Sequence, residues 1–123
     1  MQPLQGIRII DFCNVVMGPY ATQLLAEYGA DVIKIEPPEG DDSRRTGLFV
    51  EQDMASLFLG VNRGKRSMVL DLKEPSSTEP LHKLIRSADV LVHNIRPQKL
   101  EKLGLSARQT GACAAGPPRR QWR

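Results

Sequence analysis

The residues best suited to chemistry form a basic run in the middle of the chain. Arg63, Lys65 and Arg66 flank Gly64 and precede an apolar segment over 68–72. An apolar run bounded by turn residues is typical of a buried strand, so the cations are expected on a loop that leads into a sheet. Glycine lets the backbone approach a ligand, and lysine and arginine donate charge-assisted hydrogen bonds. The run therefore suits a ligand with several phosphates, but a solvated basic turn has the same composition.

The elements that would position this run are strands and helices in alternation. Short apolar segments predict four strands, over 7–12, 31–35, 68–72 and 90–92. Helical spacing and capping residues predict helices that start at Pro19, at Met54, after Ser76 or Ser77, and at Gln98. Glycines are predicted to end three of these helices, at positions 29, 60 and 104. This alternation predicts an α/β fold with a Rossmann-like parallel sheet and flanking helices.

Ligands of such folds bind where strands lead into helices at the carboxyl edge of the sheet. The turns expected there cover 13–18, 36–47, 73–77 and 93–98. Asp11 precedes the first turn and is interpreted as structural, bonded to nearby backbone. These turns are the predicted site of any phosphate-bearing ligand.

Charge is distributed unevenly along the chain. All 14 acidic residues lie at or before Glu101, so residues 1–107 carry 13 basic and 14 acidic side chains. The net charge of +3 therefore belongs to the end of the chain and not to the predicted fold. A nucleic-acid-binding domain would need a basic face on its structured part, which argues against that function.

The two cysteines, Cys13 and Cys113, form neither a disulfide framework nor a metal-binding pattern. Cys13 follows an apolar strand and is interpreted as a small buried side chain. The sequence lacks the features of a signal peptide and any apolar stretch of about 18 residues, so no membrane segment is expected. A reducing, cytoplasmic location fits these observations.

Periodicity ends after Ser106. Residues 108–123 combine small residues, a proline pair and isolated arginines, and are predicted to be disordered. The predicted domain therefore spans 1–107, and a frameshift near residue 108 would explain so abrupt a change.

Six segments of the chain form an ordered series: Pro3–Phe12, Met17–Pro19, Leu25–Glu36, Asn62–Lys73, Ala88–Pro97 and Leu100–Leu105. In this order and at this spacing they resemble the N-terminal region of the family III coenzyme A transferases, a group that includes formyl-CoA transferase, carnitine-CoA transferase and alpha-methylacyl-CoA racemase. Members of the family are several hundred residues long, so the resemblance implies a fragment that holds the CoA-binding part of an incomplete domain.

The resemblance implies acyl-CoA and carboxylic acid substrates, no metal, and an interlocked homodimer. In the transferases an aspartate carboxylate attacks the acyl-CoA thioester and expels CoA thiolate, which leaves a mixed anhydride. The thiolate then opens this anhydride, which releases the donor acid and leaves an enzyme-bound CoA thioester that the acceptor acid displaces. No aspartate of this chain matches the motif of that nucleophile, and the key residues are expected downstream. No catalytic residue is therefore assigned, and the chain alone is not expected to transfer CoA.

The resemblance also implies which positions bind CoA. They are Val16, Met17, Leu70, Lys73, Asn94 and Lys102, with Arg63, Lys65 and Arg66 as weaker candidates for phosphate contact. Some relatives carry Gln and Ala where this chain has Val16 and Met17, and Pro37 replaces a cation found in others.

Two alternatives remain open from the sequence. Glu36 ends the second predicted strand, as the ribose-binding acid does in dinucleotide domains, so a stand-alone nucleotide-binding module is possible. Against it, the turn over 13–18 lacks the G-x-G-x-x-G pattern. The second alternative is an inactive, truncated gene product.

Overall fold

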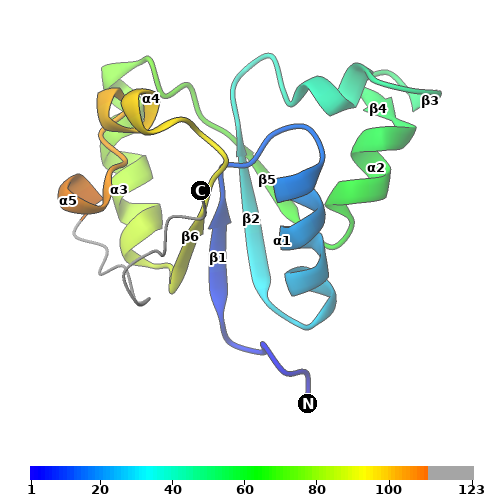
Figure 1. The fold of residues 1–123 in the computed structure, drawn as a ribbon, viewed down its shortest axis with the longest axis horizontal. Helices are drawn as coiled ribbons and strands as arrows, with labels where there is room; N and C mark the ends of the chain where they lie inside the picture. The colour runs from blue at the N-terminus through cyan, green and yellow to red at the C-terminus, as the bar shows by residue number, and fades with distance from the viewer. Residues whose placement is uncertain (111–123) are drawn as a thin grey trace, which may run out of the picture.

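A four-stranded parallel sheet forms the centre of the molecule. The structure, a computed structural model, describes residues 1–110. Its strands lie side by side in the order β5-β2-β1-β6 (Figure 1). They are β1 (Arg8–Asp11), β2 (Asp31–Glu36), β5 (Arg66–Val69) and β6 (Val90–Val92). All three pairings are parallel, so the predicted α/β fold with a parallel sheet is confirmed.

Helices cover both faces of the sheet (Figure 1). One face is covered by α1 (Met17–Glu27) and α2 (Ser56–Asn62), and the other by α3 (Thr78–Arg86) and α4 (Pro97–Lys102). The remaining elements are the turns η1 (Asp42–Arg45) and η2 (Pro75–Ser77), the hairpin of β3 (Phe49–Glu51) and β4 (Met54–Ala55), and α5 (Ala107–Thr110). Within residues 1–110, no helix combines the length and apolar composition needed to cross a membrane.

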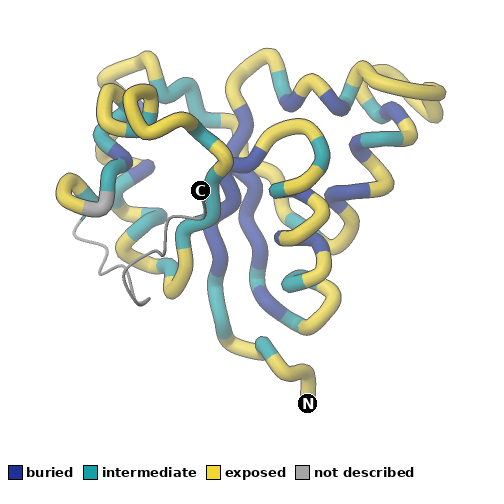
Figure 2. Tube along the Cα trace, in the orientation of Figure 1, coloured by how far each residue is buried: buried dark blue, intermediate teal, exposed yellow. Residues whose placement is uncertain are grey.

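Side chains of a strand alternate between the two faces of the sheet, which divides the core in two. Ile10, Ile33 and Ile35 pack with the apolar side chains of α3 and α4. Ile9 and Val32 pack on the other face, against α1. The buried residues are therefore concentrated in the two central strands (Figure 2).

The third strand of the sheet begins and ends a few residues before its predicted bounds. It was expected over 68–72 and is observed at Arg66–Val69. Its last pairing joins Val69 to Glu36, and the Leu70 amide donates to the Glu36 carbonyl. Beyond Glu36 the partner strand continues into Pro37 and Pro38, neither of which has an amide hydrogen, so the ladder ends there.

The predicted helix over 54–59 was also wrong in its bounds. Residues 54–55 form β4, and the helix runs from Ser56 to Asn62. Gly60 does not end it, because its φ is not positive, whereas Gly64 beyond the helix has φ 78°. Gly29 and Gly104, with φ 99° and 70°, follow α1 and α4 as predicted. Ser77 precedes α3 but makes no capping hydrogen bond with its side chain.

The predicted disordered segment over 108–123 is described only at its start. Residues 108–110 belong to α5. The other residues of that segment, with Cys113, lie outside the described part of the chain.

Leu105 is expected to contribute strongly to stability because it is 1% exposed and packs in the core beside α3 and α4. Leu105→Ala should lower the free energy of unfolding by about 2–5 kcal/mol in urea denaturation. The matched control is Leu48→Ala, at a leucine that is 82% exposed, which should change it by less than about 0.5 kcal/mol. Equal effects of the two substitutions would contradict this description of the core.

Candidate functional site: the carboxyl edge of the sheet

The face of the sheet that α1 covers changes from apolar to charged near its carboxyl edge. Asp11 follows Ile9 on this face of β1, while Lys34 and Glu36 follow Val32 on β2. All three charged side chains are almost completely buried. Because an isolated buried charge is costly, each requires an oppositely charged partner.

Lys34 is paired with Asp41, from the loop after β2. Its Nζ lies 2.7 Å from Asp41 Oδ2, and both side chains are at most 1% exposed. Lys34 Nζ also donates to the Cys13 carbonyl at 2.6 Å. Burial raises the pKa of Asp41, but hydrogen bonds from Lys34 and Ser43 outweigh burial and hold this pKa below its ordinary 3.8. The Asp41 carboxylate is therefore ionised at neutral pH.

Glu36 is paired with Arg44 of η1 in a bidentate arrangement. Arg44 Nε and Nη2 each donate to a Glu36 carboxylate oxygen at 2.7 Å. Ser67 Oγ and the Asp41 amide donate to the same carboxylate. Burial raises the pKa of Glu36, but these donors, Arg44 first, bring it below its ordinary 4.5. The Arg44 guanidinium also stacks over Phe58 at 3.7 Å, which ties α2 to this cluster.

Asp11 is paired with Lys65. Lys65 Nζ donates to Asp11 Oδ2 at 3.0 Å, and also to the Pro19 carbonyl and Asn62 Oδ1. The Lys65 side chain is 2% exposed. Burial lowers the pKa of Lys65, and the Asp11 carboxylate opposes that effect. Asp11 is thus structural, as predicted, but it binds a distant lysine as well as nearby backbone.

Side chains from several elements hold the backbone of the turn between β1 and α1. The Cys13 amide donates to Asp11 and the Val15 amide to Asp41 Oδ1. The Asn94 side-chain amide makes two hydrogen bonds with the backbone of Asn14, one as acceptor and one as donor. Cys13 is buried as predicted, and burial together with Asp11 raises the pKa of its thiol to about 12.

Two adjoining pockets lie on the opposite face, beside α3 and α4. The smaller, of about 130 Å³, is lined by residues in or after all four strands of the sheet, including Phe12, Leu70 and Ile95. The second, of about 360 Å³, lies between the segment after β5 and the end of α4. Leu72, Lys73 and Leu103 line both pockets, which therefore adjoin and are named together the cleft; its lining combines leucines and lysines with the acidic residues Asp71 and Glu74.

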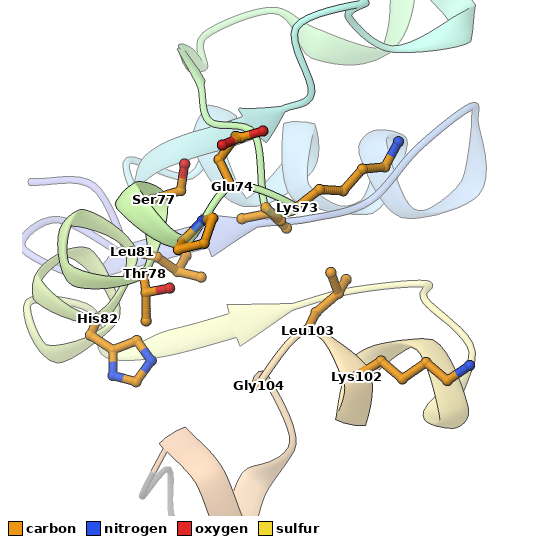
Figure 3. Close-up of a pocket in the computed structure, with 11 residues that line it drawn as sticks. Lys73, Glu74, Ser77, Thr78, Leu81, His82, Lys102, Leu103 and Gly104 are labelled. Atoms are coloured by element: carbon orange, nitrogen blue, oxygen red, sulfur yellow. The ribbon is translucent and has the colours of Figure 1, made fainter.

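The lysines at this cleft extend from two different elements. Figure 3 shows the side chains of Lys73 and Lys102 reaching toward the same side of the view, with Leu103 between their backbones. Lys99 lines the smaller pocket. Leucines and lysines that line one cleft suit a ligand that has an apolar arm and an anionic head.

Six of the nine predicted CoA-binding residues lie in two groups, one at the cleft and one at the start of α1. Leu70, Lys73 and Lys102 line the cleft. Val16 ends the turn before α1 and Met17, which is 80% exposed, begins the helix, while Asn94 holds that turn. These six positions all lie at the carboxyl edge of the sheet.

The basic run of Arg63, Lys65 and Arg66 lies apart from the cleft, and each of its cations binds a carboxylate. Lys65 binds Asp11, as described above, while Arg63 binds Glu27 and Arg66 binds Asp31. Arg66 is in β5 and not on a loop. Their role in phosphate binding stays a prediction.

Sequence reasoning missed the buried ion pairs. A signal for them was present in β2, where Lys34 and Glu36 interrupt an otherwise apolar strand. A strand of a parallel sheet is covered on both faces, so such charges require buried partners. The Glu36 carboxylate is fully used by Arg44 and its neighbours, which argues against its role as a ribose-binding acid.

Comparison with known proteins identifies the family. The sequence profile described as CoA-transferase family III matches residues 4–114. The chain belongs to CoA-transferase family III. Its membership confirms the family expected from the order of the six sequence segments.

Curated relatives of the chain are named as CoA-transferases. It is 47% identical to succinate–glutarate CoA-transferase of Agrobacterium fabrum over 110 residues, with 84% of this chain and 28% of that protein covered. It is 42% identical to succinyl-CoA:glutarate CoA-transferase of Mus musculus, with 85% and 24% covered. It is 48% identical to formyl-CoA:oxalate CoA-transferase of Rhodopseudomonas palustris strain BisB18, with 84% and 24% covered. The chain thus spans about a quarter of the length of these relatives.

Solved structures support the same assignment. A CaiB/BaiF family protein from Brucella suis superposes with a TM-score of 0.82 at 37% identity, over 89% of this chain and 30% of that one. A hypothetical protein from Mycobacterium tuberculosis gives a TM-score of 0.80 at 38% identity, over 89% and 30%. The α/β arrangement seen here is therefore that of related crystal structures.

Acid is expected to destabilise the fold through Glu36 and Asp41. Their pKa values in the folded chain lie below the ordinary 4.5 and 3.8, so the ionised carboxylates stabilise the fold above those values. That contribution is lost as pH falls through this range. The melting temperature, followed by circular dichroism from neutral pH to about pH 3, should therefore fall steeply below about pH 4.5.

A variant and a control assign this acid effect. Glu36→Gln should lower the melting temperature at neutral pH and flatten its decline in acid, because the Arg44 pair is already lost. Glu79→Gln, at an exposed carboxylate paired with Lys83, should keep the parent profile. An unchanged profile for Glu36→Gln would contradict the role given to this pair.

Proposed function

We propose that this chain forms the CoA-binding part of an acyl-CoA:carboxylate CoA-transferase. The observation that carries the proposal is the cleft at the carboxyl edge of the sheet, which is lined by three of the residues expected to bind CoA, Leu70, Lys73 and Lys102. A crevice outside the carboxyl ends of parallel strands is the usual ligand site of such sheets. Its lining includes residues that follow β1 and β6, the two neighbouring strands between which the chain reverses its direction of travel across the sheet.

Each chemical group of CoA can be matched to a part of the cleft whose side chains suit it. The pantetheine arm is long and uncharged, and it would lie along Phe12, Leu70 and Ile95. The phosphates would interact with Lys73 and Lys102, through charge-assisted hydrogen bonds that need no fixed donor plane. The turn with Val16 and Met17 would lie near the thioester. Arg63, Lys65 and Arg66 contribute by neutralising carboxylates that shape the fold.

The transfer itself would require more of the protein than this chain contains. In the complete enzyme we propose that an aspartate carries CoA as a thioester between carboxylic acids, within an interlocked homodimer. The names of the relatives specify succinate, glutarate and oxalate, and we propose a dicarboxylate acceptor on that basis. Within residues 1–110 no group of three or more His, Cys, Asp or Glu side chains is placed to hold a metal ion, and a metal-free site stays a prediction.

CoA titration of the full 123-residue chain tests this proposal. Isothermal calorimetry should detect CoA binding, and Lys73→Met and Lys102→Met should each weaken it about tenfold, because each removes a hydrogen bond between charged groups. Raising the salt concentration should reduce the difference from the parent chain. CoA should also raise the melting temperature, and NAD should not, since only a ligand of the folded state stabilises it.

Lys83→Met is the matched control. Lys83 is an exposed lysine of α3, paired with Glu79 at 2.9 Å, and its substitution should leave CoA affinity unchanged. The proposal fails if the parent chain does not bind CoA, or if the three lysine variants bind it equally well.

A further inference from the structure

We propose that Asp41 is a positioning residue for CoA binding, because it holds the turn between β1 and α1 in a conformation that its sequence disfavours. The inference rests on the proposed function. It concerns a residue that does not itself line the cleft and that acts through the backbone of Val15.

Val15 has a backbone conformation that valine rarely adopts. Its φ is 72°, in the left-handed region, where a β-branched side chain is a genuine outlier. The side chain is 48% exposed, so packing around it does not account for this conformation. Such strain persists only where the surroundings fix the backbone.

Asp41 supplies that constraint. The Val15 amide donates to Asp41 Oδ1 at 3.2 Å. Asp41 is itself immobilised, because the Ser43 amide and hydroxyl donate to the same oxygen and Lys34 binds its other oxygen. Lys34 also binds the carbonyl of Cys13, two residues before Val15. One buried ion pair therefore fixes the backbone on both sides of Asn14.

The strained residue, Val15, directly precedes two residues that are expected to bind CoA. Val16 and Met17, two of the residues expected to bind CoA, follow Val15 directly, and α1 begins at Met17. If Val15 relaxed to a negative φ, the peptide planes of the next residues would rotate and carry both side chains to new positions. Asn94 fixes only Asn14, which leaves Asp41 as the contact to the Val15 amide within residues 1–110.

The test compares two double variants in which the buried charges are removed together, because a buried lysine without its partner would destabilise the fold. The acceptor variant, Lys34→Met with Asp41→Asn, keeps a side-chain oxygen for the Val15 amide. The acceptor-free variant, Lys34→Met with Asp41→Ala, lacks it. The acceptor-free variant should bind CoA about tenfold more weakly than the acceptor variant, which corresponds to about 1.4 kcal/mol.

A third substitution separates positioning from general stability. Val15→Gly, added to the acceptor-free variant, should restore most of the CoA affinity, because glycine adopts positive φ without steric cost. Asp53→Gly is the matched control, since Asp53 also has a positive φ of 58° but lies in the β3–β4 hairpin. It should not restore binding. Equal CoA affinity of the two double variants, or no rescue by Val15→Gly, would overturn the proposal.

Two measurements on Val15 itself decide the inference when the CoA affinities of the variants cannot be compared. If the parent chain does not bind CoA, the proposed function fails, and the intraresidue amide–Hα NOE of Val15, strong at positive φ, decides this inference. It should be strong in the acceptor variant and weak in the acceptor-free variant; no difference would overturn it. If the acceptor-free variant does not fold, amide hydrogen exchange in the parent chain decides it. Protection of the Val15 amide is expected, and exchange at the rate of a free amide would refute it.

Discussion

The burial of charge at the carboxyl ends of β1 and β2 is the constraint on which the rest of the structure depends. Asp11, Lys34 and Glu36 leave water when helices cover the sheet, and each would be costly without a partner. Their partners come from distant segments: Lys65 follows α2, while Asp41 and Arg44 belong to the loop after β2. Loop and helix positions are therefore determined by charge pairing as much as by apolar packing.

The same strands serve two purposes on their two faces. On β2, Ile33 and Ile35 face the apolar core under α3 and α4, whereas Lys34 and Glu36 face α1 and α2. The ionic face fixes the turn that follows β1, and the apolar face provides the wall of the cleft. A ligand in the cleft would then meet a surface whose backbone is held rigid from behind, so less conformational freedom is lost on binding.

Much of the architecture could be predicted from local patterns, but the ion pairs could not. Alternating apolar segments identified the four strands, and Gly29 and Gly104 identified helix ends, because both signals depend on neighbouring residues only. The partner of Lys34 depends on the fold, since nothing local distinguishes Asp41 from Asp42 in the same loop; one is buried and the other exposed. The ion pairs of the basic run could not be predicted for the same reason. Its composition suits phosphate, and no local signal shows that the fold brings Glu27, Asp11 and Asp31 to its three cations.

The position of β1 in the sheet has a consequence for the order in which the protein acquires its structure during synthesis. β1 is made first, yet one of its two neighbours is β6, and the contact between Arg8 and Asp89 joins residues 81 positions apart. The core also includes Leu105. One edge of β1 therefore stays unpaired until nearly all of residues 1–110 have left the ribosome. Such late pairing of distant segments makes folding slow. Until it occurs, the unpaired edge of β1 in the nascent chain must be kept from pairing with strands of other chains.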